Sequence, residues 1–294
     1  MIDFLKYRSL CAAFSVLIFT TFIGTYIYKY QQRGHAFNYS VDFTGGTQVL
    51  FGFSKPVSSC QITNALEKGG FRGVSTREFS DVEHLVRVKE VVVDVAGLAE
   101  NMKKSLEAEF KDNNIEIKQT DSVGSGISAK LRWDSFLAIV IGLILMLLYI
   151  ALRFWSFAFA TGAVLSLFHD AVVILAIFLL FDKEISINVI MAILTILGYS
   201  INDTIVIFAK IRENLAKHRN MSAEKVVNLS INETLRRTTL TSFATLLVVI
   251  SLFLFGGEVL RDLSLALLIG IVFGTYSSIY IASPIMLLLY KDNR

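Results

Sequence analysis

Shortages in the sequence exclude several classes of protein. The 294 residues include 2 cysteines and 4 histidines, which are too few for a disulfide framework and are not spaced as a zinc site. Cys11 lies in an apolar run and Cys60 in a polar segment, so we expect two free thiols that do not bridge. The glycine-containing stretch from Asp42 to Thr47 lacks the GxxxxGK[ST] pattern of a phosphate loop. We therefore expect neither a cofactor nor a resident metal ion.

Hydrophobic residues are what the chain has in excess, because they make up 54% of it and gather in long runs. A helix needs about 20 apolar residues to cross the ~30 Å hydrocarbon core of a bilayer. Six runs reach roughly this length, namely Leu10–Tyr28, Ser135–Leu152, Phe157–Phe181, Ile185–Phe208, Thr239–Phe255 and Leu263–Tyr290. The sequence therefore predicts a multi-pass α-helical membrane protein. The first run is too long for a signal peptide and no small-residue cleavage site follows it, so we expect an uncleaved anchor.

Lysine and arginine predict the orientation, since they collect in cytoplasmic connections. They occupy alternate connections, at Lys6, Arg8, Arg153, Lys210, Arg212, Lys217, Arg219, Lys225, Arg236, Arg237, Lys291 and Arg294. We therefore expect both termini in the cytoplasm. The predicted parts are a cytoplasmic start with the first helix (1–28), a periplasmic domain (29–134), a five-helix bundle (135–290) with a cytoplasmic loop (209–238), and a cytoplasmic tail (291–294).

The predicted periplasmic domain alternates between strand-like and helix-like patterns. Strands are expected at Gln48–Phe53, Val74–Phe79, His84–Val93 and Ile115–Gln119, and helices at Ser59–Lys68 and Val95–Phe110. The order βαββαβ is typical of a small α+β ferredoxin-like domain.

Asp203 is the most informative single residue. A carboxylate near the centre of a membrane helix costs about 2.5–3.5 kcal/mol on insertion scales, and such a group normally marks an ion or proton site. Arg237 stands where the fifth run begins and can reach the depth of Asp203 if the two helices are neighbours. Pairing with a guanidinium favours the charged carboxylate, and loss of the pair in an apolar place favours the protonated acid. The two residues therefore predict a protonation switch. For Arg237 and for its neighbour Arg236, simple membrane anchoring is an equal alternative.

Other polar residues in the runs allow both a functional and a structural interpretation. His169 and Asp170 lie near the middle of the third run. They are interpreted either as members of a proton relay or as packing and hydrogen-bonding groups. Asn202 sits beside Asp203, and Ser200 and Thr204 are near it in the sequence. These three residues are interpreted either as the lining of a hydrated polar track or as hydrogen-bonding groups between helices.

Glycines mark two places where the backbone approaches another segment or turns. Gly270 and Gly274 form a GxxxG pattern, which permits close helix contact, and we expect it to face a second subunit. Gly45 and Gly46 follow Asp42 and predict a tight turn into the first strand.

The basic segment from Lys210 to Arg237 also contains Glu213, Glu224 and Glu233. The mixed charge favours a cytoplasmic amphipathic helix at the membrane surface. It argues against a nucleic-acid partner.

These features together resemble the SecF family, whose members are the smaller partners of SecD in the accessory complex of the bacterial Sec translocon. The match rests on VDFTGGT at 41–47, LFHD at 167–170, GYSINDT at 198–204 with IREN at 211–214, TLRRT at 234–238, and FGG at 255–257 with SSIY at 277–280. Gly198 opens the third of these stretches. Family members often have Asp-Arg where this chain has Ala209 and Lys210, which puts a local salt bridge at the cytoplasmic end in doubt.

The resemblance implies an RND-type half in the bacterial inner membrane that uses the proton-motive force to assist late steps of protein export. It implies SecD, the SecYEG translocon, YajC, YidC, an unfolded translocating polypeptide and membrane lipid as partners. It also assigns proton conduction to Asp203 and Arg237, with Na⁺ left open as the coupling ion. The chain is then not an enzyme.

Three alternatives remain at the level of sequence. An RND exporter half for a lipid or small molecule shares the same six-helix layout. A passive scaffold of a translocon needs no ion path. An intramembrane aspartyl protease needs two carboxylates in contact, and the usual Gly-x-Gly-Asp is absent around Asp203.

Overall fold

The computed structural model describes residues 2–71, 73–88 and 95–290. The chain divides into two compact units, one made of Met1–Asn38 with Phe136–Arg294 and the other of Tyr39–Ser135. We refer to them as the membrane unit and the α+β unit. The predicted boundary after residue 28 falls too early, because the first helix continues to Arg33. The predicted tail, 291–294, lies outside the described residues.

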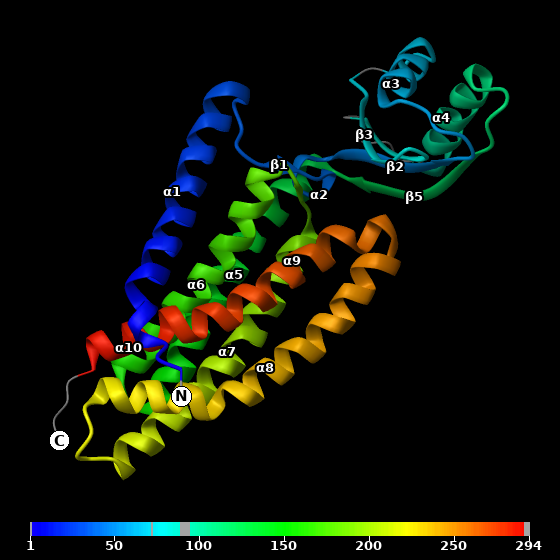
Figure 1. Ribbon diagram of the computed structural model, residues 1–294. Coiled ribbons are helices and arrows are strands. Elements are labelled where there is room, and N and C mark those ends of the chain that lie inside the picture. The colour runs from blue at the N-terminus through cyan, green and yellow to red at the C-terminus, as the bar shows by residue number, and fades with distance from the viewer. Residues whose placement is uncertain (1, 72, 89–94, 291–294) are drawn as a thin grey trace. The chain divides into compact units, whose positions relative to one another are not determined.

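The membrane unit is helical, and its elements are shown in Figure 1. They are a 3₁₀ turn at Leu5–Tyr7, α1 (Arg8–Arg33), α5 (Ser125–Phe154, within this unit from Phe136), α6 (Phe157–Leu180), β6 (Glu184–Ile185), α7 (Ile187–Lys217), α8 (Ala223–Phe255), α9 (Gly257–Ser277), a π-helical turn η2 (Ser278–Ala282) and α10 (Ser283–Leu289). Among the described residues, six helical segments are long and apolar enough to cross a membrane. The six-helix prediction is thereby confirmed.

The sixth span is interrupted where proline removes a helical donor. Pro284 lies in the first turn of α10, directly after η2. A proline has no N–H for the helical ladder, and the hydroxyl of Ser283 donates to the Ser278 carbonyl over 3.0 Å. α6 passes close to this turn, because a Cβ at Gly162 would lie 2.6 Å from the carbonyl oxygen of Ala282.

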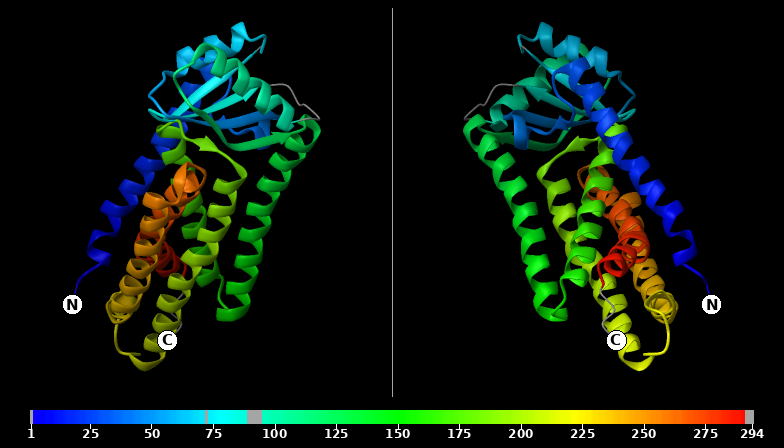
Figure 2. Two further views of the ribbon diagram at one scale, coloured as in Figure 1. Left: turned by 90° about the vertical axis from the view of Figure 1, so that its right-hand side faces the viewer. Right: turned by 90° about the vertical axis from the view of Figure 1, so that its left-hand side faces the viewer.

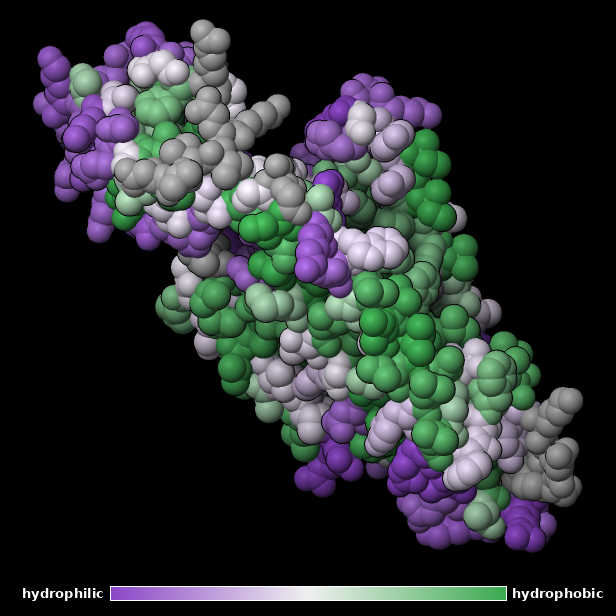
Figure 3. Space-filling model, turned by 180° about the vertical axis from the view of Figure 1, so that it is seen from behind, coloured by the Kyte–Doolittle hydropathy of each residue, from purple (hydrophilic) through white to green (hydrophobic). Residues whose placement is uncertain are grey.

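α6, α7 and α9 form the centre of the membrane unit, whereas α1 and α5 lie at its outside. Most of the apolar stretch of α6 is buried, and almost none of that of α1 or α5 is. Figure 2 shows α1 and α5 along the periphery, with the start of α1 and the end of α10 at the same end of the unit. The middle of the unit presents mainly hydrophobic side chains (Figure 3), as expected for a lipid-facing belt.

The segment 209–238 is not the loop that was predicted, but most of it is helical, as was predicted from its mixed charge. α7 continues to Lys217 and α8 begins at Ala223, so the connection comprises residues 218–222. Hydropathy fell along this stretch because the helices carry charged side chains there, and a fall in hydropathy does not end a helix. Figure 1 shows α8 running first across the end of the bundle and then bending into it.

The α+β unit contains α2 (Val41–Thr44), β2 (Gly46–Phe53), α3 (Ser59–Lys68), β3 (Ser75–Ser80), β4 (Glu83–Val88), α4 (Val95–Glu109) and β5 (Ile115–Val123), and β1 (Asn38–Tyr39) begins at its boundary. The sheet order is β3-β4-β2-β5 with antiparallel neighbours. This order confirms the ferredoxin-like prediction.

Apolar side chains on one face of this sheet pack against α3 and α4. Phe51, Ile62, Val86, Met102 and Leu106 are fully buried there. The α3 helix starts with a reciprocal cap between Ser58 and Gln61. The strand predicted at 84–93 is present at Glu83–Val88, and its remainder, 89–93, lies outside the described residues.

Candidate functional site

Two glycines of α9 allow this helix to lie against α7. A Cβ at Gly270 would lie 2.4 Å from Cγ1 of Ile196, and one at Gly274 would lie 2.9 Å from Oγ of Ser200. The GxxxG pattern is thus used inside the chain, which corrects the expectation that it faces a second subunit. A glycine pattern shows that a helix has a close neighbour, but it does not identify the neighbour.

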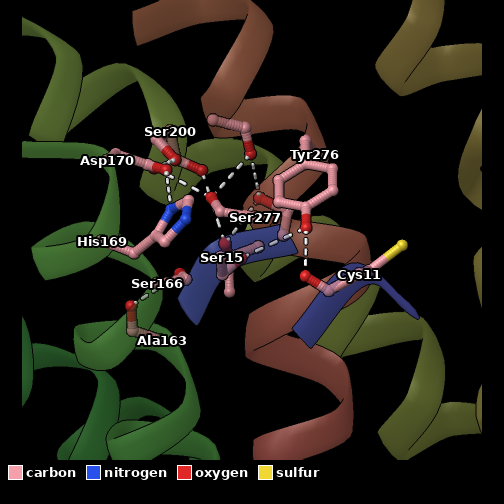
Figure 4. A network of polar contacts seen from close by, with 12 residues as sticks. Cys11, Ser15, Ala163, Ser166, His169, Asp170, Ser200, Tyr276 and Ser277 are labelled. Atoms are coloured by element: carbon pink, nitrogen blue, oxygen red, sulfur yellow. Dashed lines mark hydrogen bonds and ion pairs between the residues drawn. The ribbon is translucent and has the colours of Figure 1, made fainter. Parts of the chain in front are cut away.

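The close approach of α7 and α9 places Asp170 of α6 among hydroxyl groups (Figure 4). Its Oδ2 accepts hydrogen bonds from Ser200 of α7 at 2.7 Å and from Ser277 of α9 at 2.9 Å. Its Oδ1 lies 3.4 Å from Nδ1 of His169. Asp170 is fully buried. The carboxyl group therefore joins three helices through a nearly satisfied network, which is the structural interpretation of this residue.

His169 lies between this network and the outer helix α1. Its ring is buried and packs at 5.9 Å from the Phe19 ring and 6.0 Å from the Tyr276 ring. Its Nε2 has no hydrogen-bond partner among the described residues. Tyr276 donates to the carbonyl of Cys11 at 2.8 Å, and its hydroxyl lies 3.2 Å from Ser15 Oγ. Polar contacts thus fix α1 on the bundle.

Asp203 occupies a different junction, where α7, α8 and α9 meet. Its side chain is buried, and Ser242 of α8 donates to its Oδ2 at 3.4 Å. Ser242 Oγ also lies 2.8 Å from Thr275 Oγ1 of α9. Among the described residues this is the single side-chain hydrogen bond of Asp203, whereas Asp170 accepts two from hydroxyl groups. Asp170 and Asp203 are held by different hydroxyl groups, and this arrangement argues against the protease alternative.

Arg237 and Asn202 are exposed on the surface of the membrane unit. Arg237 lies five residues before Ser242 on α8, about 7.5 Å along the helix axis. No ion pair joins Arg237 and Asp203 among the described residues. Asn202 points away from the junction that holds Asp203, although it precedes that residue in the sequence.

The ends of α7 and α8 are tied together below this junction. Buried Asn214 donates to Ser230 Oγ at 3.0 Å and to Glu233 Oε2 at 2.7 Å. Lys210 lies 3.2 Å from Glu213 and 3.4 Å from Glu233. The residue at which this chain departs from the family pattern therefore still forms a salt bridge between the helices.

The opposite end of the bundle has its own ion pairs. Lys29 and Arg33 of α1 each lie 2.9 Å from carboxylate oxygens of Asp182. Burial acts to raise the pKa of Asp182, but the hydrogen bonds and charges of Lys29 and Arg33 outweigh it and lower the pKa.

The glycine pair of the α+β unit makes a turn, as predicted. Ser40 caps the short helix α2 by accepting from the Asp42 N–H at 3.2 Å, and it donates to the Asp42 carboxylate at 2.8 Å. Gly45 and Gly46 then adopt φ values of 75° and 117° and lead into β2. Residues with a side chain rarely adopt these angles.

Sequence reasoning missed four side chains of the two networks, Ser15, Ser242, Thr275 and Tyr276. Hydroxyl groups are common in membrane helices, so their type gave no signal. Their neighbours across the bundle became clear only from the helix packing.

Gly198 is exposed, with open space around it. The described residues hold no cluster of three or more metal-binding side chains.

Comparison with known proteins gives the family. The C-terminal model of "Protein export membrane protein SecD/SecF" matches residues 102–292, and the SecD/SecF GG motif matches residues 35–57. Protein translocase subunit SecF of Thermodesulfovibrio yellowstonii is 38% identical over 99% of this chain and 96% of its own length. The SecF subunit of Vibrio alginolyticus is 36% identical over 98% and 90%.

A solved structure agrees with these matches. The crystal structure of SecDF from Thermus thermophilus, a translocon-associated membrane protein, superposes with a TM-score of 0.85 at 34% identity. It covers 98% of this chain, and this chain spans 38% of the SecDF chain. The chain therefore belongs to the SecD/SecF family of protein export membrane proteins, in its SecF group.

Proposed function

We propose that the chain is an accessory subunit of the bacterial Sec translocon that uses the proton-motive force to assist late steps of protein export across the inner membrane. The observation that carries this proposal is Asp203, a carboxyl group buried at a three-helix junction of the membrane unit with one long hydrogen bond. Buried ionisable groups in membrane spans are costly and mark ion or proton paths. Asp170, in contrast, has the partners of a structural residue.

Proton transfer at Asp203 has a physical route to helix movement. A charged Asp203 attracts the Arg237 guanidinium, which lies more than a helical turn before Ser242 on α8. A protonated Asp203 needs only the Ser242 hydroxyl group as its partner. Each elementary charge that crosses 100 mV supplies about 2.3 kcal/mol, which is enough to bias a movement of α8 against α7. The movement would be used to pull or hold an emerging polypeptide through the α+β unit.

The partner in this proposal is SecD, a second six-helix half. Support comes from a relative, the SecDF subunit of Thermus thermophilus, which is 40% identical over 88% of this chain. The match covers 35% of the SecDF chain. Exposed polar residues on α7 and α8, such as Asn202, Arg237 and Thr241, are costly against lipid and are suited to a protein partner. SecYEG, YajC and YidC are the further candidates for contact.

The test is export of a secreted protein by membranes that contain SecD with wild-type chain or Asp203→Asn, with and without a proton-motive force. We expect the variant to assemble at normal abundance and to lose the stimulation by the gradient. Stimulation at the wild-type level in this variant would refute the mechanism. Ion flux into proteoliposomes, with H⁺ and Na⁺ varied separately, identifies the coupling ion. A passive scaffold would show no flux at all.

The orientation can be tested independently. Both termini are expected in the cytoplasm, with the α+β unit in the periplasm. In a chain whose Cys11 and Cys60 are replaced by serine, single cysteines at Lys111 and Lys217 should react with an impermeant reagent from opposite sides. Reaction of both from the same side would contradict this topology.

A second candidate is an RND exporter half for a lipid or small molecule. The same buried carboxyl group would serve such an exporter. It is distinguished by gradient-driven movement of a small substrate in the absence of a translocating polypeptide.

A further inference from the structure

An apolar groove runs along the outer face of the membrane unit between α1, α6 and α10. Its volume is about 700 Å³. Val16, Ile23, Leu165, Phe168 and Leu288 contribute to its walls and remain widely exposed. No helix of the described chain covers it.

A second, polar cavity of about 830 Å³ lies at the end of the unit that carries the start of α1. It is formed by residues 3–9 and by the beginning of α8. Arg8 and Ser9 line both cavities. The polar cavity and the apolar groove therefore adjoin at the first turn of α1, where the lining changes from polar to apolar.

The groove is long enough to hold an acyl chain across one leaflet of a bilayer. Along α1 it extends from Arg8 to Ile23, which is about 22 Å at 1.5 Å per residue. Half of the hydrocarbon core is about 15 Å thick. An acyl chain that starts at the level of Arg8 would therefore lie in the groove over its whole length.

The charges of the polar cavity favour a negative group. Three basic residues, Lys6, Arg8 and Lys225, line it together with two acidic ones, Asp3 and Glu224. Arg8 pairs with Glu224 at 2.7 Å, whereas the Lys6 and Lys225 side chains have no ion pair among the described residues. Two ammonium groups without an ion pair thus line the same cavity.

We propose that the combined cavity binds one anionic phospholipid from the leaflet on the side of the two termini. Its phosphate contacts Lys6 and Lys225, and one acyl chain lies between α1, α6 and α10. Anionic lipids are abundant in the cytoplasmic leaflet, where each lysine near the surface contributes about 1 kcal/mol. A bound chain would cover Ser15 and His169, which line the groove and belong to the network around Asp170. The site does not depend on the proposed proton path.

The test uses the purified full chain in detergent and native mass spectrometry with phosphatidylglycerol and phosphatidylcholine of equal acyl chains. We expect tighter binding of phosphatidylglycerol. Lys6→Gln and Lys225→Gln should each weaken it about fivefold, the equivalent of about 1 kcal/mol per lysine. Arg219→Gln, which removes an exposed charge outside the cavity, is the matched control and should change nothing.

A pair of neighbouring variants tests the groove. Ala12 lines it and Ala13 does not, and both are exposed on α1. Ala12→Phe should reduce binding of both lipids, whereas Ala13→Phe should leave it unchanged. Thermal unfolding in detergent checks that both variants fold. A phosphatidylglycerol with a photoreactive group on its acyl chain should label α1, α6 or α10 in the wild-type protein.

Three results would overturn the proposal. They are equal binding of the two lipids with no effect of the lysine variants, equal effects of Ala12→Phe and Ala13→Phe, and acyl-chain labelling spread evenly over all exposed helices. Crosslinking of the groove to a polypeptide in native membranes would assign it to a protein partner instead.

Discussion

Ser242 of α8 donates a hydrogen bond to Asp203 of α7 across 3.4 Å, deep in the membrane unit. This hydroxyl group, and not the Arg237 guanidinium, is the direct partner of the carboxyl group in the described structure. Because Ser242 also contacts Thr275 of α9 at 2.8 Å, it connects the candidate proton site to α9.

We expect Ser242→Ala to weaken export stimulated by the proton-motive force without abolishing it. The variant removes a hydrogen bond to the proposed proton site, and hydrogen bonds to charged groups contribute about 1.5–3 kcal/mol at good geometry. The bond is long, so a loss of about tenfold at most is expected. Export is measured with and without the gradient, and membrane levels are measured in parallel.

The control is Ser251→Ala, also on α8, where the hydroxyl is exposed and bonds to Leu247 of its own helix. A loss as large as that of Asp203→Asn would show that Ser242 itself is essential. No difference between the two serine variants would remove Ser242 from the site.

The contact between α7 and α9 predicts different effects for two glycines. A Cβ at Gly270 would lie 2.4 Å from Ile196, whereas one at Gly198 meets no atom within 4 Å. Gly270→Ala should therefore destabilise the chain by about 1–3 kcal/mol. Gly198→Ala should be neutral or stabilising by up to ~1 kcal/mol, because alanine favours a helix. Thermal unfolding of the purified chain in detergent measures both, and equal stabilities would contradict the close packing of α7 and α9 at Gly270.

Asp182 predicts an acid-dependent contribution to stability. Its pKa is lowered from the ordinary 3.8 by Lys29 and Arg33. A group with a depressed pKa in the folded state stabilises the fold at pH values above its ordinary pKa of 3.8. This stabilisation is lost as the pH falls through the depressed pKa. Because the carboxylate is 43% exposed, the effect is at most about 1 kcal/mol.

Asp182→Asn tests this effect with little disturbance of the backbone. Asp182 has a φ of 53°, an angle that asparagine tolerates. The variant should melt below the wild type at neutral pH, and the difference should vanish in acid. Asp112→Asn, at an exposed position, serves as the control. A difference that persists below the depressed pKa would show that the ion pairs do not carry it.

The sequence predicted the parts of the fold that depend on local pattern. Long apolar runs identified the six spans, and alternation identified the strands of the ferredoxin-like unit. The end of α7 at Lys217 escaped prediction, because a helix that leaves the hydrocarbon core can continue in water. The neighbour of Gly270 escaped it too, since the same GxxxG pattern serves contacts within a chain and between chains.

The candidate site was predictable in its residue types but not in its connections. Asp170 and Asp203 stood out because a carboxyl group is costly in a span. Their separate roles arise from tertiary packing. Ser200 lies three residues before Asp203, and yet it donates to Asp170. Only the crossing of α6, α7 and α9 decides which carboxyl group receives which hydroxyl.

Two adjacent arginines of α8 can separate a proton switch from membrane anchoring. Arg236 and Arg237 are both exposed near the point where α8 enters the bundle, and Arg237 lies five residues before Ser242, the hydrogen-bond partner of Asp203. A lysine keeps the charge but lacks the planar fork with which a guanidinium binds a carboxylate. If Asp203 pairs with Arg237 during the cycle, Arg237→Lys should lose most of the gradient-driven stimulation and Arg236→Lys should retain it. Anchoring requires only a positive charge, so it predicts near-normal activity for both variants. Export with and without the proton-motive force, at matched membrane levels and with SecD present, distinguishes the two. Full stimulation in Arg237→Lys would show that Asp203 does not require the guanidinium as a partner. The remaining candidates for a partner in the switch would then be the hydroxyl groups of Ser242 and Thr275.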